Sequence, residues 1–117
     1  KQNPVVRGNA TVEEALLAIT SAKSGSCTIV DKNGKLKGNF TDGDLRRHLK
    51  LNGVSILKKQ IEPLSTKRPS AIAENRLAAE ALQILRDRKI DELPVVNAKG
   101  RVVGLLDVQD LLKAGFV

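Results

Sequence analysis

Hydrophobic positions along the chain recur in two series that contain the same elements in the same order. The first series opens at Thr11, which is followed three residues later by Glu14; this spacing is typical of a capping box at the start of a helix. Ala15, Leu16 and Ile19 then share one face at helical spacing. We therefore expect an amphipathic helix that begins directly after Thr11.

Two short apolar runs follow this helix and predict a β-hairpin. The runs cover Cys27–Val30 and Leu36–Phe40, and the segment between them contains Gly34, which suits the positive φ of a tight turn. After the second run, Asp42 or Asp44 can cap another helix. The first series thus predicts helix, hairpin, helix.

The second series predicts the same three elements. Asn75 is a candidate cap for its first helix. The apolar positions of that helix are Leu77, Ala81, Leu82 and Leu85. Two strands are expected at Leu93–Val96 and Val102–Leu106, and Asp107 or Asp110 can cap the last helix.

A shift of 66 positions superposes the second series on the first without a gap. The residues that are identical under this shift include Asn9 and Asn75, Glu14-Ala15-Leu16 and Glu80-Ala81-Leu82, Lys23 and Lys89, Val30 and Val96, Gly34 and Gly100, Gly38 and Gly104, and Asp44-Leu45 and Asp110-Leu111. Because both glycines and the Asp-Leu pair stay in register, we interpret the halves as copies of one repeat.

One copy alone would leave an apolar face of its sheet exposed to water. We therefore expect an α+β fold in which two pseudo-twofold-related repeats pack through their sheets. The expected boundaries are residues 1–52 for the first repeat, 53–69 for a connector containing Gly53, Pro63 and Pro69, and 70–117 for the second repeat. The chain begins with Lys1 rather than Met, so we also expect it to be part of a longer protein.

Composition narrows the function classes for these 117 residues. The net charge is +7, but acidic residues interrupt the basic ones and aromatics make up only 2% of the chain, so a nucleic-acid surface is not favoured. No apolar run approaches the roughly 18–20 residues of a membrane span. The single cysteine, Cys27, lies in an apolar run and is expected to be a small buried side chain. We expect a cytoplasmic protein without a bound metal or cofactor.

The segment Gly38-Asn39-Phe40-Thr41-Asp42-Gly43-Asp44-Leu45 resembles the signature of CBS domains, which usually occur in tandem. In that family a nucleotide lies between the repeats, and the Asp of Thr-x-x-Asp accepts hydrogen bonds from the ribose hydroxyls. The resemblance implies ligand contacts for Thr41 and Asp44. Arg46 and Arg47 lie one turn further along and are candidates for a phosphate or carboxylate of the ligand. The alternative is that Asp44 and Asp110 only cap helices and that both arginines are solvated.

The second copy departs from the signature because Asp107 replaces the Thr. A second carboxylate at a helix start repels a phosphate, so we expect the site around Asp110 to be weaker, altered in specificity or empty. Lys67 and Arg68 precede the second repeat and are candidate phosphate neighbours. The only histidine, His48, is interpreted as a surface residue, and no motif for catalysis or for binding a metal is present.

A narrower resemblance extends to a particular enzyme family. The run from Phe40 to Arg47, together with the ending Asp110-Leu111-Leu112-Lys113-Ala114-Gly115, is similar to the C-terminal CBS pair of D-arabinose 5-phosphate isomerases. There the pair follows a sugar isomerase (SIS) domain, which converts D-ribulose 5-phosphate to D-arabinose 5-phosphate for Kdo and lipopolysaccharide synthesis. The resemblance implies a regulatory module without catalysis of its own. Its implied ligand is an adenine nucleotide or CMP-Kdo, the activated end product.

Two other functions stay open. The pair can be a ligand-free interaction module that assembles the parent oligomer, or a CBS pair that serves another enzyme or a transporter. CBS pairs usually associate into dimers, and we expect a homodimer here, for which Ala78, Ala79 and Leu82 are predicted to offer an apolar surface.

Overall fold

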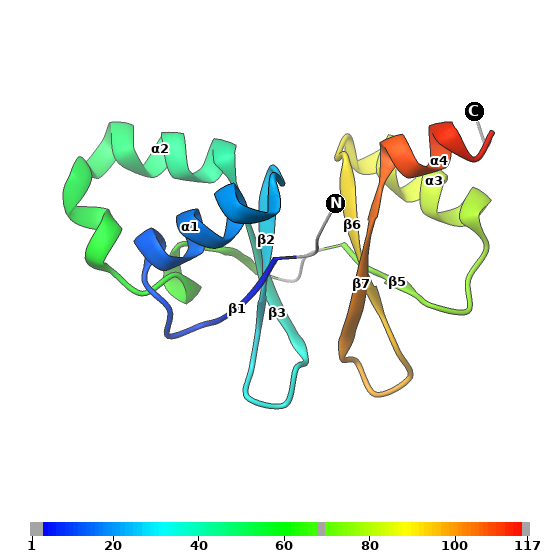
Figure 1. Ribbon diagram of the computed structural model, residues 1–117, viewed down its shortest axis with the longest axis horizontal. Coiled ribbons are helices and arrows are strands. Elements are labelled where there is room, and N and C mark those ends of the chain that lie inside the picture. The colour runs from blue at the N-terminus through cyan, green and yellow to red at the C-terminus, as the bar shows by residue number, and fades with distance from the viewer. Residues whose placement is uncertain (1–3, 68–69, 116–117) are drawn as a thin grey trace. The chain divides into compact units, whose positions relative to one another are not determined.

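The chain folds into two compact units, Lys1–Pro69 and Ser70–Val117, in a computed structural model that describes residues 4–67 and 70–115. Each unit is a small antiparallel hairpin extended by one parallel strand and covered by two helices (Figure 1). The elements of the first unit are β1 (Val5–Arg7), α1 (Val12–Ala22), β2 (Ser26–Val30), β3 (Leu36–Thr41), α2 (Asp42–Asn52), the 3-10 helices η1 (Val54–Lys58) and η2 (Glu62–Leu64), and β4 (Thr66–Lys67). Those of the second unit are β5 (Ile72–Ala73), α3 (Ala78–Arg88), β6 (Glu92–Val96), β7 (Val102–Asp107) and α4 (Val108–Lys113).

The first unit contains a four-stranded sheet in the order β1-β2-β3-β4. Strand β1 runs parallel to β2, and both β3 and β4 pair antiparallel with their neighbours. Helices α1 and α2 lie on the same side of this sheet in Figure 1. The core between them is aliphatic except for Phe40 and Cys27, and its fully buried members include Val12, Ile29 and Phe40. The expected α+β class is confirmed.

The repeat extends to details of the backbone. Lys23 and Lys89 both end their helices in the left-handed conformation, with φ of 54° and 55°. Each hairpin also has a register shift at the same place, after Ile29 in the first unit and after Val95 in the second. The turn glycines Gly34 and Gly100 have the positive φ that the sequence predicted. Equivalent sequences therefore produce equivalent conformations, which supports the interpretation of the halves as copies.

The starts of the helices differ from the predictions in two places. The capping box of Thr11 and Glu14 is confirmed. Asn75 is not the cap of α3; the cap position is Leu77, whose side chain makes no capping hydrogen bond. Helix α2 is capped by Thr41, with Asp44 as the partner three residues on, and not by Asp42. A hydroxyl directly after a strand satisfies the first free N–H groups without distorting the strand.

The segment expected to be a connector is largely folded into the first unit. Ile56 and Ile61 are buried in the first core, with exposed fractions of 1% and 0%. The backbone of this segment also bonds to the loop before α1: Ile61 N donates to Ala10 O at 2.8 Å, and Val12 N donates to Lys59 O at 2.9 Å. Residues 54–67 therefore stabilise the first unit in addition to joining the repeats.

Strand β4 requires a glycine in the strand beside it. Gly38 in β3 pairs with Lys67, and a Cβ at position 38 would lie 2.7 Å from Ser65 Oγ and 3.0 Å from Thr66 O. The equivalent Gly104 has only the Cβ of Val95 nearby, at 4.0 Å. A larger residue at position 38 would push β4 away, whereas position 104 has room for one.

The apolar surface predicted for dimerisation is not exposed as expected. Leu82 lies in the second core with an exposed fraction of 8%, and Ala78 packs against the same core. Only Ala79 of the three residues is exposed. A helix of this amphipathic type turns its leucines toward its own sheet, so Leu82 and Ala78 pack within the second unit.

Candidate functional site

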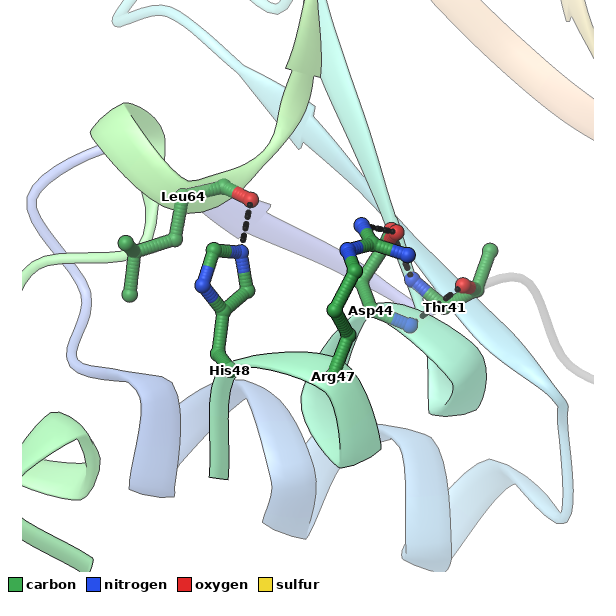
Figure 2. A network of polar contacts seen from close by, with 5 residues as sticks. All are labelled: Thr41, Asp44, Arg47, His48 and Leu64. Carbon is green, nitrogen blue, oxygen red and sulfur yellow. Dashed lines mark hydrogen bonds and ion pairs between the residues drawn. The ribbon is translucent and has the colours of Figure 1, made fainter. Parts of the chain in front are cut away.

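Thr41 and Asp44 are held together at the junction of β3 and α2 (Figure 2). The Asp44 backbone N donates to Thr41 Oγ1 at 3.0 Å, and the Thr41 backbone N donates to Asp44 Oδ2 at 2.9 Å. This reciprocal box fixes both side chains at the first turn of the helix. The residues that the CBS resemblance singles out therefore form one rigid unit.

Arg47 completes this cluster from the next turn of α2. Its Nη2 atom donates to Asp44 Oδ1 at 2.6 Å, the length of a charge-assisted hydrogen bond. The exposed fraction is 9% for the Asp44 side chain and 58% for that of Arg47. The carboxylate is thus nearly buried, whereas the guanidinium that neutralises it remains in contact with solvent.

His48 follows on the same helix and ties it to the 3-10 segment. Its Nε2 atom lies 3.2 Å from Leu64 O (Figure 2). Its ring also stacks on Phe40 at a centroid distance of 6.4 Å. A carbonyl oxygen only accepts, so Nε2 must carry the proton. His48 is half-buried and structural. In the sequence, the four-residue spacing between Asp44 and His48 was the signal that both side chains lie on one face of α2.

The other predicted ligand residues are arranged differently. Arg46 is exposed, and its Nη2 atom lies 4.0 Å from the position that a Cβ on Gly43 would occupy, so it folds back along the first turn. Lys67 turns its ammonium toward the end of η2, where it donates to Glu62 O and lies 3.3 Å from Ser65 Oγ. Arg68 lies outside the described residues.

The second unit has a related but different arrangement. Asp107 caps α4 by accepting from Gln109 N at 2.7 Å, and Asp107 N donates to Asp110 Oδ2 at 3.3 Å. Asp107 is buried and Asp110 is exposed, the reverse of a half-buried Thr41 beside a buried Asp44. Lys113 stands at the position equivalent to Arg47, and in the described part of the chain it makes no ion pair with Asp110.

Three further observations bear on the chemistry available. Cys27 is buried as expected, and burial raises the pKa of its thiol to about 12, which keeps it protonated and unreactive. Within residues 4–67 and 70–115, no group of three or more His, Cys, Asp or Glu side chains is placed to hold a metal ion. In the same residues no helix is long and apolar enough to cross a membrane.

Two copies of a strand-helix-hairpin-helix unit, one with a Thr-x-x-Asp box at its second helix, define a class of small tandem α+β modules. The family model for the CBS domain matches residues 1–51 and 60–116. The chain belongs to the CBS domain family, as the sequence predicted.

Curated relatives point to one group of enzymes. The chain is 41% identical over 112 residues to the arabinose 5-phosphate isomerase KdsD of Pseudomonas aeruginosa, a match that covers 96% of this chain and 34% of that protein. It is 35% identical over 114 residues to KdsD of Escherichia coli K12, covering 97% of this chain and again 34% of the relative. The chain therefore spans about a third of the length of the curated relatives it matches.

Solved structures share the fold over nearly the whole chain. The CBS domain pair of protein MJ0100, in complex with 5′-methylthioadenosine and S-adenosyl-L-methionine, is 25% identical with a TM-score of 0.84, covering 97% of this chain and 88% of that one. The cytosolic domain of the Mg²⁺ channel MgtE, in complex with ATP, is 26% identical with a TM-score of 0.81, covering 96% of this chain and 44% of that one.

Proposed function

We propose that this chain is the nucleotide-sensing or nucleotide-sugar-sensing regulatory module of an arabinose 5-phosphate isomerase. The parent enzyme then carries a separate SIS domain, acts in the cytoplasm and supplies arabinose 5-phosphate for lipopolysaccharide synthesis. The similarity to KdsD proteins over almost the whole chain supports this parent. The adenosine compounds bound to two similar CBS modules, 5′-methylthioadenosine and S-adenosyl-L-methionine in one and ATP in the other, support a ligand that contains a nucleoside.

The observation that carries the proposal is the geometry of Asp44. Its Oδ2 atom is anchored by the Thr41 backbone N, and its Oδ1 atom accepts from the solvent-exposed side chain of Arg47. A carboxylate offers two acceptor oxygens, which suits the two donors of a ribose diol. Thr41 and one of the arginines then lie beside the phosphate of the same ligand.

The ligand is either an adenine nucleotide or CMP-Kdo. Adenine compounds follow from the similar structures, whose bound molecules all contain adenosine. CMP-Kdo follows from the proposed parent, because an early enzyme of a pathway gains control by sensing the end product. Both candidates carry a ribose diol and at least one anionic group.

The second candidate function is an assembly module that binds no small molecule. The hydrogen bonds of Asp44 favour this function, because both carboxylate oxygens already accept from groups within the chain. On this view the cluster stabilises the start of α2, and the module acts through contacts between copies.

Calorimetry against AMP, ATP, CMP and CMP-Kdo separates the two functions. We expect at least one of these ligands to bind, and Asp44→Ala to weaken that ligand by about ten- to a hundredfold, because a charge-assisted hydrogen bond is worth roughly 1.5–3 kcal/mol. Asp110→Ala is the matched control and should change the affinity little, since Asp107 already places a negative charge at the second site.

Three outcomes are informative. Equal loss of binding in both variants would mean that the two repeats share one site. Absence of binding for all four ligands would favour the assembly module. The chain should also convert no pentose 5-phosphate by itself, because the sequence contains no motif that would supply an acid–base pair for proton transfer between C1 and C2.

A further inference from the structure

The partners of Asp44 differ in how easily they can be displaced. Oδ2 accepts from the backbone N of Thr41, which stays in place as long as α2 keeps its first turn. Oδ1 accepts from Arg47, a long side chain that is 58% exposed. An ion pair with one solvated partner contributes little, because solvent screens it and ordering the side chain costs entropy. Arg47 is therefore the partner that can leave.

A diol cannot reach Asp44 unless Arg47 moves. The Asp44 side chain is only 9% exposed, and the guanidinium lies 2.6 Å from the oxygen that is not held by the backbone. A neutral nucleoside would take that oxygen and leave Arg47 without a counter-charge. A nucleotide would supply a phosphate to which the released guanidinium can donate.

We propose that Arg47 is the specificity-determining residue of this site, exchanging Asp44 for the anionic group of the ligand when a diol binds. The inference rests on the proposed function, namely ligand binding at Asp44. It assigns the ligand class as a compound that carries both a vicinal diol and a phosphate or carboxylate. Nucleosides are disfavoured because they break the Arg47–Asp44 pair without replacing it.

Among the described residues, Arg46 and Lys113, the cations most comparable with Arg47, are not paired with the aspartate of a Thr-x-x-Asp box. Arg46 makes no hydrogen bond or ion pair in the described part of the chain, so its release is not coupled to the state of Asp44. In the second unit Lys113 replaces Arg47. An ammonium cannot form the planar bidentate hydrogen bonds that a guanidinium makes to a carboxylate or phosphate. The exchange is therefore confined to the first unit.

The test compares each nucleoside with its 5′-monophosphate: adenosine with AMP, and cytidine with CMP. Dissociation constants are measured by calorimetry for the wild-type chain and for Arg47→Gln, Arg47→Lys, Arg46→Gln and Lys50→Gln. We expect Arg47→Gln to bind the nucleoside about 2- to 5-fold more tightly, because the competing ion pair is gone. The monophosphate should bind about tenfold more weakly, because a charged hydrogen bond is lost. The preference for the phosphate thus falls by about 20-fold or more.

The controls decide between this role and a general effect of charge. Lys50→Gln removes the same charge from the last turn of α2 and should leave the preference unchanged. Arg47→Lys should retain part of the preference for the monophosphate that Arg47→Gln loses. Equal weakening of nucleoside and monophosphate by Arg47→Gln, or loss of the preference in Arg46→Gln instead, would overturn the assignment to Arg47 while leaving ligand binding at Asp44 intact. Absence of binding to the wild-type chain for AMP, CMP, ATP and CMP-Kdo alike would overturn the proposed function, and the exchange would fail with it.

Discussion

At the scale of single residues, the first positions of the three long helices α1, α2 and α3 and of the short α4 show how much a helix start matters. α1, α2 and α4 each begin with a reciprocal capping box, supplied by Thr11 and Glu14, Thr41 and Asp44, and Asp107 and Asp110. α3 is capped by Leu77, whose side chain offers no acceptor for the free N–H groups of the first turn. Leu77 is also 69% exposed, so its apolar side chain gains little from folding.

We therefore expect Leu77→Thr to stabilise the second unit. The backbone at this position is already extended, with φ of −76° and ψ of 148°, and Glu80 stands at the third position of the helix, as Glu14 does in α1. A hydroxyl at this cap should raise the free energy of unfolding by about 0.5–2 kcal/mol. Urea denaturation followed by far-UV circular dichroism measures the change.

Leu77→Ala is the control for this experiment. It removes the exposed leucine without supplying an acceptor, so its stability should stay close to that of the wild type. If the alanine variant gains as much as the threonine variant, the effect comes from losing an exposed apolar group and not from capping.

The candidate site was only partly predictable from its residues. The signature located Thr41 and Asp44, but it gave several candidates for the cap, because Asp42 and Asp44 are both good capping residues. The threonine prevails because it is the last residue of β3 and is already extended. The ion pair was not predicted, although Asp44 and Arg47 are three residues apart, a spacing at which helix side chains meet. Arg46 and Arg47 looked equivalent as long as the phase of the helix was unknown.

At the scale of elements, the hairpins and helices were predicted well and the short strands were missed. The hairpins have alternating or continuous apolar runs joined by a turn glycine, which is a strong local signal. β1, β4 and β5 contain only two or three residues, too few for any periodicity to appear. Residues 54–67 lie outside the ungapped match between the two repeats, so their apolar positions looked like those of a linker.

The folded connector leads to a prediction about stability. Ile61 is fully buried in the first core although it lies between the repeats. Ile61→Ala should lower the free energy of unfolding by about 2–5 kcal/mol, because it deletes buried methyl groups and leaves a cavity. Chemical denaturation of both proteins measures the difference.

Val54→Ala is the matched control in the same segment. Val54 is 75% exposed, so shortening it should cost less than about 0.5 kcal/mol. Comparable losses for Val54→Ala and Ile61→Ala, or no loss for Ile61→Ala, would show that residues 54–67 act only as a tether.

At the scale of the whole molecule, the two copies have diverged in charge. Residues 1–69 contain 13 Lys and Arg against 6 Asp and Glu, whereas residues 70–117 contain seven of each. The entire net charge of +7 therefore belongs to the first unit. A positive potential raises the local concentration of anions, which agrees with the assignment of the anionic ligand to the unit that holds Thr41, Asp44 and Arg47.

Within residues 4–67 and 70–115, the two units also differ in the structure that supports them. The first unit has a fourth strand and the buried residues Ile56 and Ile61, from η1 and the segment after it, whereas the second unit has a three-stranded sheet. Burial of a large aliphatic side chain contributes roughly 1.5–3 kcal/mol, so these two isoleucines are a substantial part of the stability of the first unit.

We therefore expect the second unit to open before the first under native conditions. The amides of β6 and β7 should exchange with solvent at least about 30-fold faster than those of β2 and β3, corresponding to a difference in opening free energy of about 2 kcal/mol or more. Hydrogen exchange read by mass spectrometry compares the two hairpins directly, since their strands are of equal length. Alkylation of Cys27 gives an independent rate for the first unit, because its buried thiol reacts only when that unit opens. Equal exchange in both hairpins, at a rate that matches the alkylation of Cys27, would show instead that the two repeats unfold as a single cooperative body.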